Sequence, residues 1–160
     1  MYDLSKFDEK FGKYINIKLA NTNDLGDIYN TQITAFPDDP ANLSIDDFTN
    51  AIHDKKHTLF VATYKDEFAG YTALYQKTFS PWASGNNIIV VQKFTVKCIA
   101  PYLLRHAIKH CKRPFIRIYV EKNNKKAIQL YRKFGFFHVS TIAKHYENGD
   151  DALVMMIFTW

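Results

Sequence analysis

The chain has 160 residues, 47% of them apolar and 23% charged, a composition that excludes a disordered chain and fits a single globular domain over residues 1–160. Its apolar runs are shorter than the roughly 20 residues of a membrane helix, and its N-terminal residues lack the apolar stretch of a signal peptide, so we expect a cytoplasmic protein without a membrane partner. The net charge of +5 conceals an asymmetry, because residues 97–133 carry eleven Lys or Arg and one Glu, or +10, and the rest carries −5; one region therefore favours an anion.

The first third of the chain predicts one strand followed by two helices. Residues 15–19 alternate apolar and polar side chains, as in a half-buried strand. A helix with several candidate N-caps in residues 21–24 follows and ends at the Pro37 turn. Ser44 is the expected N-cap of a second helix, which runs to about His53.

Three strands are expected next. Residues 58–64 and 68–75 are rich in aromatic and β-branched side chains and are separated by three polar residues, which predicts a hairpin. Residues 88–96 predict a third strand after a turn-rich segment at 80–87.

The second half alternates helices and strands. A helix is expected over 99–112, a strand over 115–120, and a helix with Asn123 or Asn124 as its N-cap and Gly135 as its C-terminal left-handed residue. Residues 136–143 and 152–160 then predict a closing hairpin. The order β-α-α-β-β-β-α-β-α-β-β indicates an α/β (α+β) fold.

The cysteines and histidines do not indicate a metal site. Cys98 and Cys111 form no C-x-x-C pair, and on one helix they would lie roughly 20 Å apart, too far for a disulfide. His106 and His110 have helical i, i+4 spacing without an acidic third ligand nearby. Cys98 is a weak candidate nucleophile, because a helix start lowers the pKa of a thiol but no His or acidic partner is evident.

Residues 120–136 closely resemble the motif N-x-x-A-x-x-L-Y-x-x-x-G-F of the GCN5-related N-acetyltransferases (GNAT). Every fixed position is matched, by Asn124, Ala127, Leu130, Tyr131, Gly135 and Phe136. Residues 146–155 are similar to the closing hairpin of that family, and the order of elements is the same. The resemblance covers nearly the whole chain and implies a GNAT fold, with a mixed, mostly antiparallel sheet of about seven strands flanked by four helices.

The resemblance implies an acetyl-CoA-dependent N-acetyltransferase in which a primary amine of a small molecule or protein attacks the thioester directly. The cosubstrate would lie in a wedge where the fourth and fifth strands part, and Tyr131 matches the acid for the leaving thiolate. The backbone of residues 94–96, as the fourth strand, would hold the pantetheine arm and polarise the carbonyl. The residues implied in cofactor binding are Phe94, Thr95, Val96, Cys98, Ile99, Ala100, Asn124 and Lys133.

The segment that should bind the CoA diphosphate departs from the family signature Q/R-x-x-G-x-G/A. A gapless alignment puts Thr95, Cys98 and Ala100 at the key positions, of which only Ala100 fits. In an alternative alignment, residues 92–96 end the fourth strand and about six loop residues are absent. Pro101 lacks an N–H, and the β-branched Val96 disfavours a positive φ. A second hypothesis is therefore a catalytically impaired binding or regulatory module with the same fold.

The general base is not identified by the sequence. An alkyl ammonium must lose a proton before the amine attacks. The acceptor site is expected near residues 36–42 and 79–87. The candidate bases, besides a water relay, are Asp38, Asp39, Asp46, Glu67 and His145.

The basic segment has two interpretations. Together with Tyr119, Tyr131 and Phe134 it suits a nucleic-acid surface, but a solvated helix face beside a CoA-phosphate site is the preferred interpretation, so we expect no nucleic-acid partner. Pairing of the closing strand across a homodimer stays open.

Overall fold

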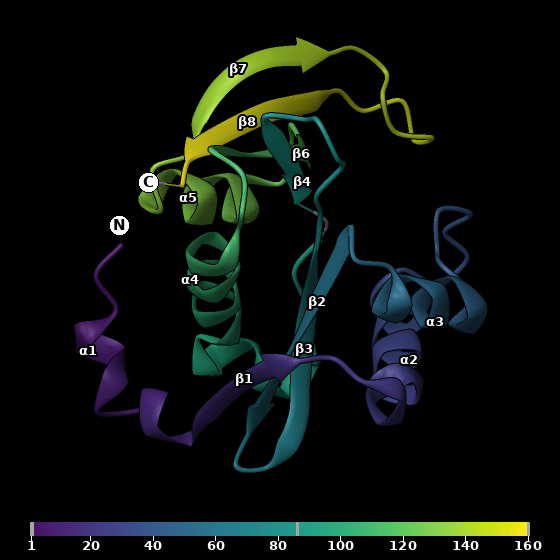
Figure 1. Cartoon of the computed structure of the whole chain (residues 1–160). Helices are drawn as coiled ribbons and strands as arrows, with labels where there is room; N and C mark the ends of the chain where they lie inside the picture. The colour runs from purple at the N-terminus through teal and green to yellow at the C-terminus, as the bar shows by residue number, and fades with distance from the viewer. Residues whose placement is uncertain (1, 86, 160) are drawn as a thin grey trace.

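The computed structural model describes residues 2–85 and 87–159. Figure 1 shows one curved sheet with helices on both faces. The helices are α1 (Ser5–Asp8), α2 (Leu25–Ala35), α3 (Ile45–His53), α4 (Ile99–His110) and α5 (Lys125–Lys133). The strands are β1 (Ile15–Leu19), β2 (His57–Tyr64), β3 (Glu67–Tyr75), β4 (Trp82–Gly85), β5 (Ile89–Val90), β6 (Phe115–Glu121), β7 (Phe137–Ile142) and β8 (Ala152–Phe158).

The sheet is mixed and mostly antiparallel. Its order is β1-β2-β3-β4-β6-β8-β7, and the short β5 pairs with β3 beside that path. Only the β4–β6 pair is parallel among the described strands. The sheet contains the seven predicted strands, one of them shortened to Ile89–Val90, and the additional strand β4 in the segment predicted to be a turn. The predicted fold class, a mixed and mostly antiparallel sheet with helices, is confirmed.

The strands bury their two faces in separate cores. Phe60 and Ala62 of β2 belong to the larger cluster, which includes the buried side of α4 and α5. Leu59 and Val61, on the opposite face of the same strand, pack with Ile28 of α2 and Phe48 of α3. Because side chains alternate along a strand, one sheet can carry α4 and α5 on one face and α2 and α3 on the other (Figure 1).

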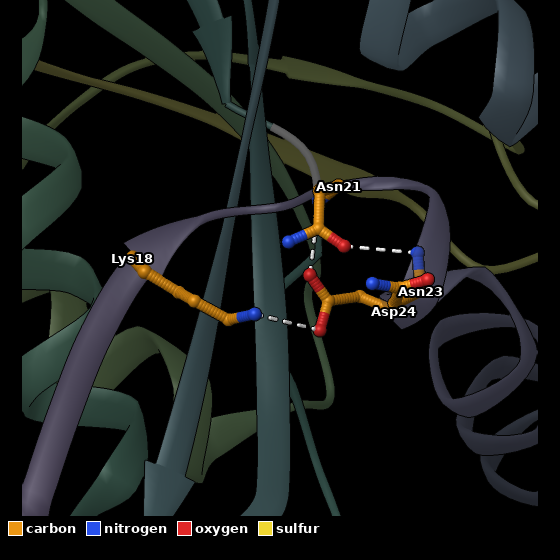
Figure 2. A network of polar contacts seen from close by, with 4 residues as sticks. All are labelled: Lys18, Asn21, Asn23 and Asp24. Atoms are coloured by element: carbon orange, nitrogen blue, oxygen red, sulfur yellow. Dashed lines mark hydrogen bonds and ion pairs between the residues drawn. The ribbon is translucent and has the colours of Figure 1, made fainter.

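A capped turn sets the start of α2. The carboxylate of Asp24 accepts the backbone N–H of Asn21 at 2.9 Å and the ammonium of Lys18 at 3.0 Å (Figure 2). The side chain of Asn21 accepts the backbone N–H of Asn23. Asp24 is buried, so these partners satisfy a carboxylate that would otherwise destabilise the fold. They tie α2 to the end of β1.

Most predicted elements are confirmed to within a few residues. Ser44 caps α3 in a reciprocal capping box, and Asn124 rather than Asn123 caps α5. Gly135 has a φ of +96°, as expected for the residue that ends α5. The short N-terminal helix α1 is not among the predicted elements. Among the described residues, no helix is both long and apolar enough to cross a membrane.

The strand expected over residues 88–96 is wrong. Only Ile89–Val90 pairs with β3, and Gln92–Lys97 is a 3-10 helix. The apolar positions of this segment are used differently, because Phe94 turns inward and packs against Tyr64 with their ring centroids 5.6 Å apart. The strand that pairs with β6 is instead Trp82–Gly85, in the segment predicted to be a turn.

Candidate active site

The parallel strands β4 and β6 part at the middle of the sheet. Trp82, Ala83 and Ser84 pair with Phe115, Ile116 and Arg117, and β6 then continues to Glu121. In the described residues β5 pairs with β3 and not with β6. Gly85 stands where the strands separate, and a Cβ there would lie 2.9 Å from Cγ2 of Ile118. The wedge thus opens directly after the point where the backbone of Gly85 closely approaches the side chain of Ile118.

The start of α4 has the backbone geometry of an anion-binding turn. Cys98, the residue before α4, has φ 62° and ψ 25°, which is the left-handed conformation that glycine usually supplies. Within the described residues no side chain caps this helix end. The N–H groups of Ile99 and Ala100 therefore lie at an uncapped, electropositive helix terminus, although Pro101 has no N–H to add.

The structure decides between the two alignments of this loop. Residues 92–97 form the 3-10 turn that leads into Cys98, so they are not the end of a strand. The alternative with about six absent loop residues is wrong, and the gapless alignment is consistent with the geometry. The left-handed residue falls on Cys98, the position where the family signature has its first glycine.

Three of the residues implied in cofactor binding do not lie in the strand where the resemblance predicts them. Phe94, Thr95 and Val96 do not belong to the fourth strand, which corrects their expected position. The hydroxyl of Thr95 donates to the carbonyl of Gln92 at 2.9 Å, whereas Val96 is 72% exposed. The strand residues at the wedge are instead Ile89 and Val90 of β5.

The side chain of Cys98 does not have the features of a nucleophile. Burial raises the pKa of its thiol, and nearby Lys10 only partly opposes that shift. Both cysteines are free. The direction of this shift opposes a thiolate activated by the helix start, because desolvation is the largest contribution at this position.

Tyr131 lies on the inner face of α5 and is 9% exposed. Its ring packs edge-on against Phe136, with centroids 5.3 Å apart. Burial, with a smaller contribution from the phenol of Tyr146, raises the pKa of Tyr131 to about 12. The phenol therefore stays protonated at neutral pH, which is the state required of a proton or hydrogen-bond donor.

The other two implied residues of α5 already have contacts within the chain. The side-chain oxygen of Asn124 accepts the backbone N–H of Ala127 at 3.1 Å, so Asn124 is an N-cap. The ammonium of Lys133 lies 5.5 Å from the ring centroid of Tyr2. Its positive charge adds to the basic character of this helix.

A cavity of about 640 Å³ opens on the α2 and α3 face of the sheet. One wall comes from the α2–α3 region, which carries seven Asp and no Lys or Arg over residues 21–54. The opposite wall comes from β6 and the β7–β8 loop, with Tyr119, His145 and Tyr146. Gly85 and Ile89 also line the cavity, so it reaches the mouth of the wedge. An acidic wall facing an aromatic wall suits a cation.

Only some of the candidate bases and of the residues expected at the acceptor site line this cavity. Asp39 and His145 line it, whereas Asp38, Asp46 and Glu67 are not among its lining residues. Glu67 is paired with Lys93 away from the cavity. The expectation for residues 36–42 agrees with the lining. In the segment 79–87, Gly85 and Asn87 line the cavity, whereas Phe79 is 100% exposed and is not among the lining residues.

The comparisons with known proteins agree with this geometry. A family model described as the acetyltransferase (GNAT) family matches residues 24–136, and the chain belongs to that family. Members of the family transfer acetyl groups from acetyl-CoA. No curated protein sequence matches the chain.

Three solved structures show the same fold at low sequence identity. A spermidine N-acetyltransferase SpeG chimera from Vibrio cholerae and hSSAT has a TM-score of 0.79 at 21% identity, over 91% of this chain and 96% of that one. The ribosomal-protein-S18-alanine N-acetyltransferase of Escherichia coli has 0.77 at 22%, over 91% and 94%. The putative acetyltransferase yncA of Salmonella typhimurium, solved with acetyl-CoA, has 0.79 at 16%, over 92% and 95%.

The sequence alone did not single out the aromatic wall of the cavity. Tyr146 was part of the matched hairpin, and Tyr119 was considered only as a stacking group for nucleic acid. The alternation in β6 was the available signal, because Ile116, Ile118 and Val120 are buried in one core and Tyr119 must therefore face the other side.

Proposed function

We propose that this protein is an N-acetyltransferase that transfers the acetyl group of acetyl-CoA to a primary amine by direct attack. The observation that carries the proposal is the opening where β4 and β6 part, with Tyr131 in the core on the α4 and α5 face of β6 and the acidic and aromatic cavity on the other face. Two substrates could thus approach one point from opposite faces of the sheet. That arrangement suits direct transfer without a covalent enzyme intermediate.

The chain supplies donors for a bound acetyl-CoA at both ends of the wedge. The uncapped N–H groups at the start of α4 would hold the diphosphate, and the backbone of Ile89 and Val90 would hold the pantetheine arm. Bound there, the thioester supplies an activated acetyl group. Tyr131 would donate a hydrogen bond and then a proton to the sulfur that leaves.

The acceptor would be a cationic amine that enters through the cavity. The acidic α2–α3 region attracts a positively charged molecule, and the aromatic wall offers ring faces to it. One of the similar structures is named for spermidine and another for a protein alanine, so the fold accommodates both small amines and proteins. We propose a small cationic amine or a protein amine, in the cytoplasm.

The test is a Tyr131→Phe variant together with acetyl-CoA titration by calorimetry and a thiol-release assay over a panel of primary amines. We expect the wild type to bind acetyl-CoA and release thiol. Tyr131→Phe should keep its affinity for acetyl-CoA and lose turnover by about 100-fold or more, since only the donated proton is removed. Tyr14→Phe, on an exposed tyrosine, is the matched control and should have no effect.

The catalytically impaired module is the other outcome of this experiment. Two features of the sequence support this second hypothesis: Cys98 replaces the glycine of the family signature, and Pro101 has no N–H. No binding at millimolar acetyl-CoA would contradict the transferase and leave a retained fold with another partner. Binding without turnover on any amine would indicate a sensor of acetyl-CoA.

A further inference from the structure

The ring of His145 lines the same cavity as Gly85 and Ile89, the residues at the mouth of the wedge. It stacks on Tyr119 of β6 with ring centroids 5.6 Å apart and an interplanar angle of 8°. Tyr146 meets the same ring edge-on, with centroids 5.0 Å apart and an angle of 87°. Two aromatic contacts therefore hold an imidazole from the β7–β8 loop against β6, although the residue itself is exposed.

The other titratable groups of the cavity are occupied within the chain. Asp39 accepts the backbone N–H of Ala41 at 2.9 Å. Asp47 accepts the hydroxyl and the backbone N–H of Ser44, and these hydrogen bonds lower its pKa. Each of these carboxylates closes a local turn on the α2–α3 wall.

The remaining cavity carboxylate behaves in the same way. Asp54 accepts the backbone N–H of Lys56 and contacts Nδ1 of His57 at 2.9 Å. The hydrogen bond from Lys56, followed by that from His57, lowers the pKa of Asp54. A carboxylate whose ionised form is stabilised in this way is a poor proton acceptor.

Tyr146 also links His145 to Tyr131, the proposed proton donor. Tyr146 touches His145 and lies close enough to Tyr131 to contribute to its raised pKa. Burial, and next the nearby carboxylate of Glu121, raises the pKa of Tyr146 itself. The three side chains thus run from the cavity, across the β7–β8 loop, to the α5 side of the wedge.

We propose that His145 is the general base that takes the proton from the acceptor ammonium in this reaction. This inference rests on the proposed acetyl transfer. A free imidazole nitrogen takes one proton, the amine forms a bond to the acetyl carbon, and the bond from that carbon to sulfur breaks. The amine gives up two protons in all: one passes from His145 to solvent, which its exposure allows, and the other replaces the proton that Tyr131 gives to the leaving thiolate.

Histidine suits this role because its side chain changes charge between pH 5 and 8, close to the working pH of most proteins. The groups that face the ring are the phenols of Tyr119 and Tyr146, with Arg117 beyond the first at 5.5 Å from its ring centroid. Lys144 and Glu147 flank it on the loop. Across the cavity lie Asp39, Asp47, Asp54 and His57.

The experiment compares His145→Gln with His138→Gln, which removes an exposed histidine of the neighbouring β7. The measurement is kcat/KM for the amine from pH 5.5 to 9 with saturating acetyl-CoA, at amine concentrations that also give KM. We expect His145→Gln to lower kcat at pH 7 by about 100-fold or more and to remove the fall in rate on the acid side. His138→Gln should remain within about two-fold, as expected of a surface position.

A second variant separates a base from a purely structural role. His145→Ala leaves space beside Tyr119, and added imidazole should restore part of its activity in a concentration-dependent way. A loss that is the same at every pH and that imidazole does not relieve would overturn the base while leaving the transferase intact. A wild type that releases no thiol with any amine would overturn both proposals.

Discussion

The two sides of the sheet use different parts of the chain to present their candidate ligand sites. On the α4 and α5 side the candidate contacts to the diphosphate and the pantetheine arm come from backbone: a left-handed Cys98, the N–H groups that follow it, and the short strand β5. On the α2 and α3 side it consists of side chains brought from segments far apart in the sequence, such as Asp39, Tyr119 and His145.

From this difference we expect the two sides to tolerate substitutions differently. A backbone site keeps its donors when the side chains change, provided that the new residues can adopt the same φ and ψ. The degenerate glycine signature is therefore a weak argument against CoA binding in this chain. A side-chain site has no such freedom, and its specificity changes with single residues.

Blocking the backbone on the cofactor side should have the largest effect. A Cβ at Gly70 would lie 2.5 Å from the carbonyl oxygen of Ile89, so Gly70→Ala must displace β5. We expect a loss of about 1–3 kcal/mol in stability and a loss of acetyl-CoA affinity of at least ten-fold, measured by denaturant unfolding and calorimetry.

The matched control for that change is Gly26→Ala in α2, where an added Cβ meets no atom within 4 Å. It should be neutral or slightly stabilising, because alanine is the better helix former. Equal acetyl-CoA affinity in Gly70→Ala and the wild type would contradict the assignment of β5 to the cofactor.

Breaking the capped turn should affect the acceptor side alone. Asp24→Ala removes the acceptor for the Asn21 N–H and the partner of Lys18 (Figure 2). We expect a loss of about 1–2 kcal/mol in stability and a raised KM for the amine, because α2 carries part of the cavity wall.

Acetyl-CoA affinity should stay unchanged in Asp24→Ala, since α2 lies on the opposite face of the sheet. Asp27→Ala removes a carboxylate at an exposed position in α2, three residues after Asp24, and is the control. A parallel fall in acetyl-CoA affinity would show that the two sides are not independent.

Restoring glycine at the left-handed position should have the smallest effect. Cys98→Gly removes the cost of a positive φ, roughly 1–2 kcal/mol, but adds some chain entropy to the unfolded state and loses the packing of the thiol. We expect a gain of about 1 kcal/mol or less in thermal unfolding, with acetyl-CoA affinity equal or higher.

Cys98→Ala keeps the strain and removes only the sulfur, so it separates the two effects. It should not be stabilised, and it should retain turnover because the proposed reaction uses no thiol of the chain. Lower acetyl-CoA affinity in Cys98→Gly than in Cys98→Ala would contradict the view that the backbone conformation, and not the side chain, holds the diphosphate.

Local patterns predicted the elements that depend on local interactions. The N-cap at Ser44, the helix that carries Tyr131 and the left-handed Gly135 follow from residues within a few positions of one another. Residues 88–96 were predicted wrongly because apolar residues that bury themselves in a 3-10 turn are hard to distinguish from those of a strand. The inward turn of Phe94 is favourable because of core residues distant in the chain, such as Tyr64, 30 positions away.

The sequence by itself determined the family, the order of the elements and the motif that carries Tyr131, because these depend on short-range spacing and composition. The extent of the domain, the location of the protein in the cell and a homodimer stay predictions. Tertiary structure alone decided that Cys98 is left-handed, that β4 and β6 part after Ser84, and that His145 rests on Tyr119. These features arise from contacts between residues distant in the sequence, whose mutual packing no local pattern encodes.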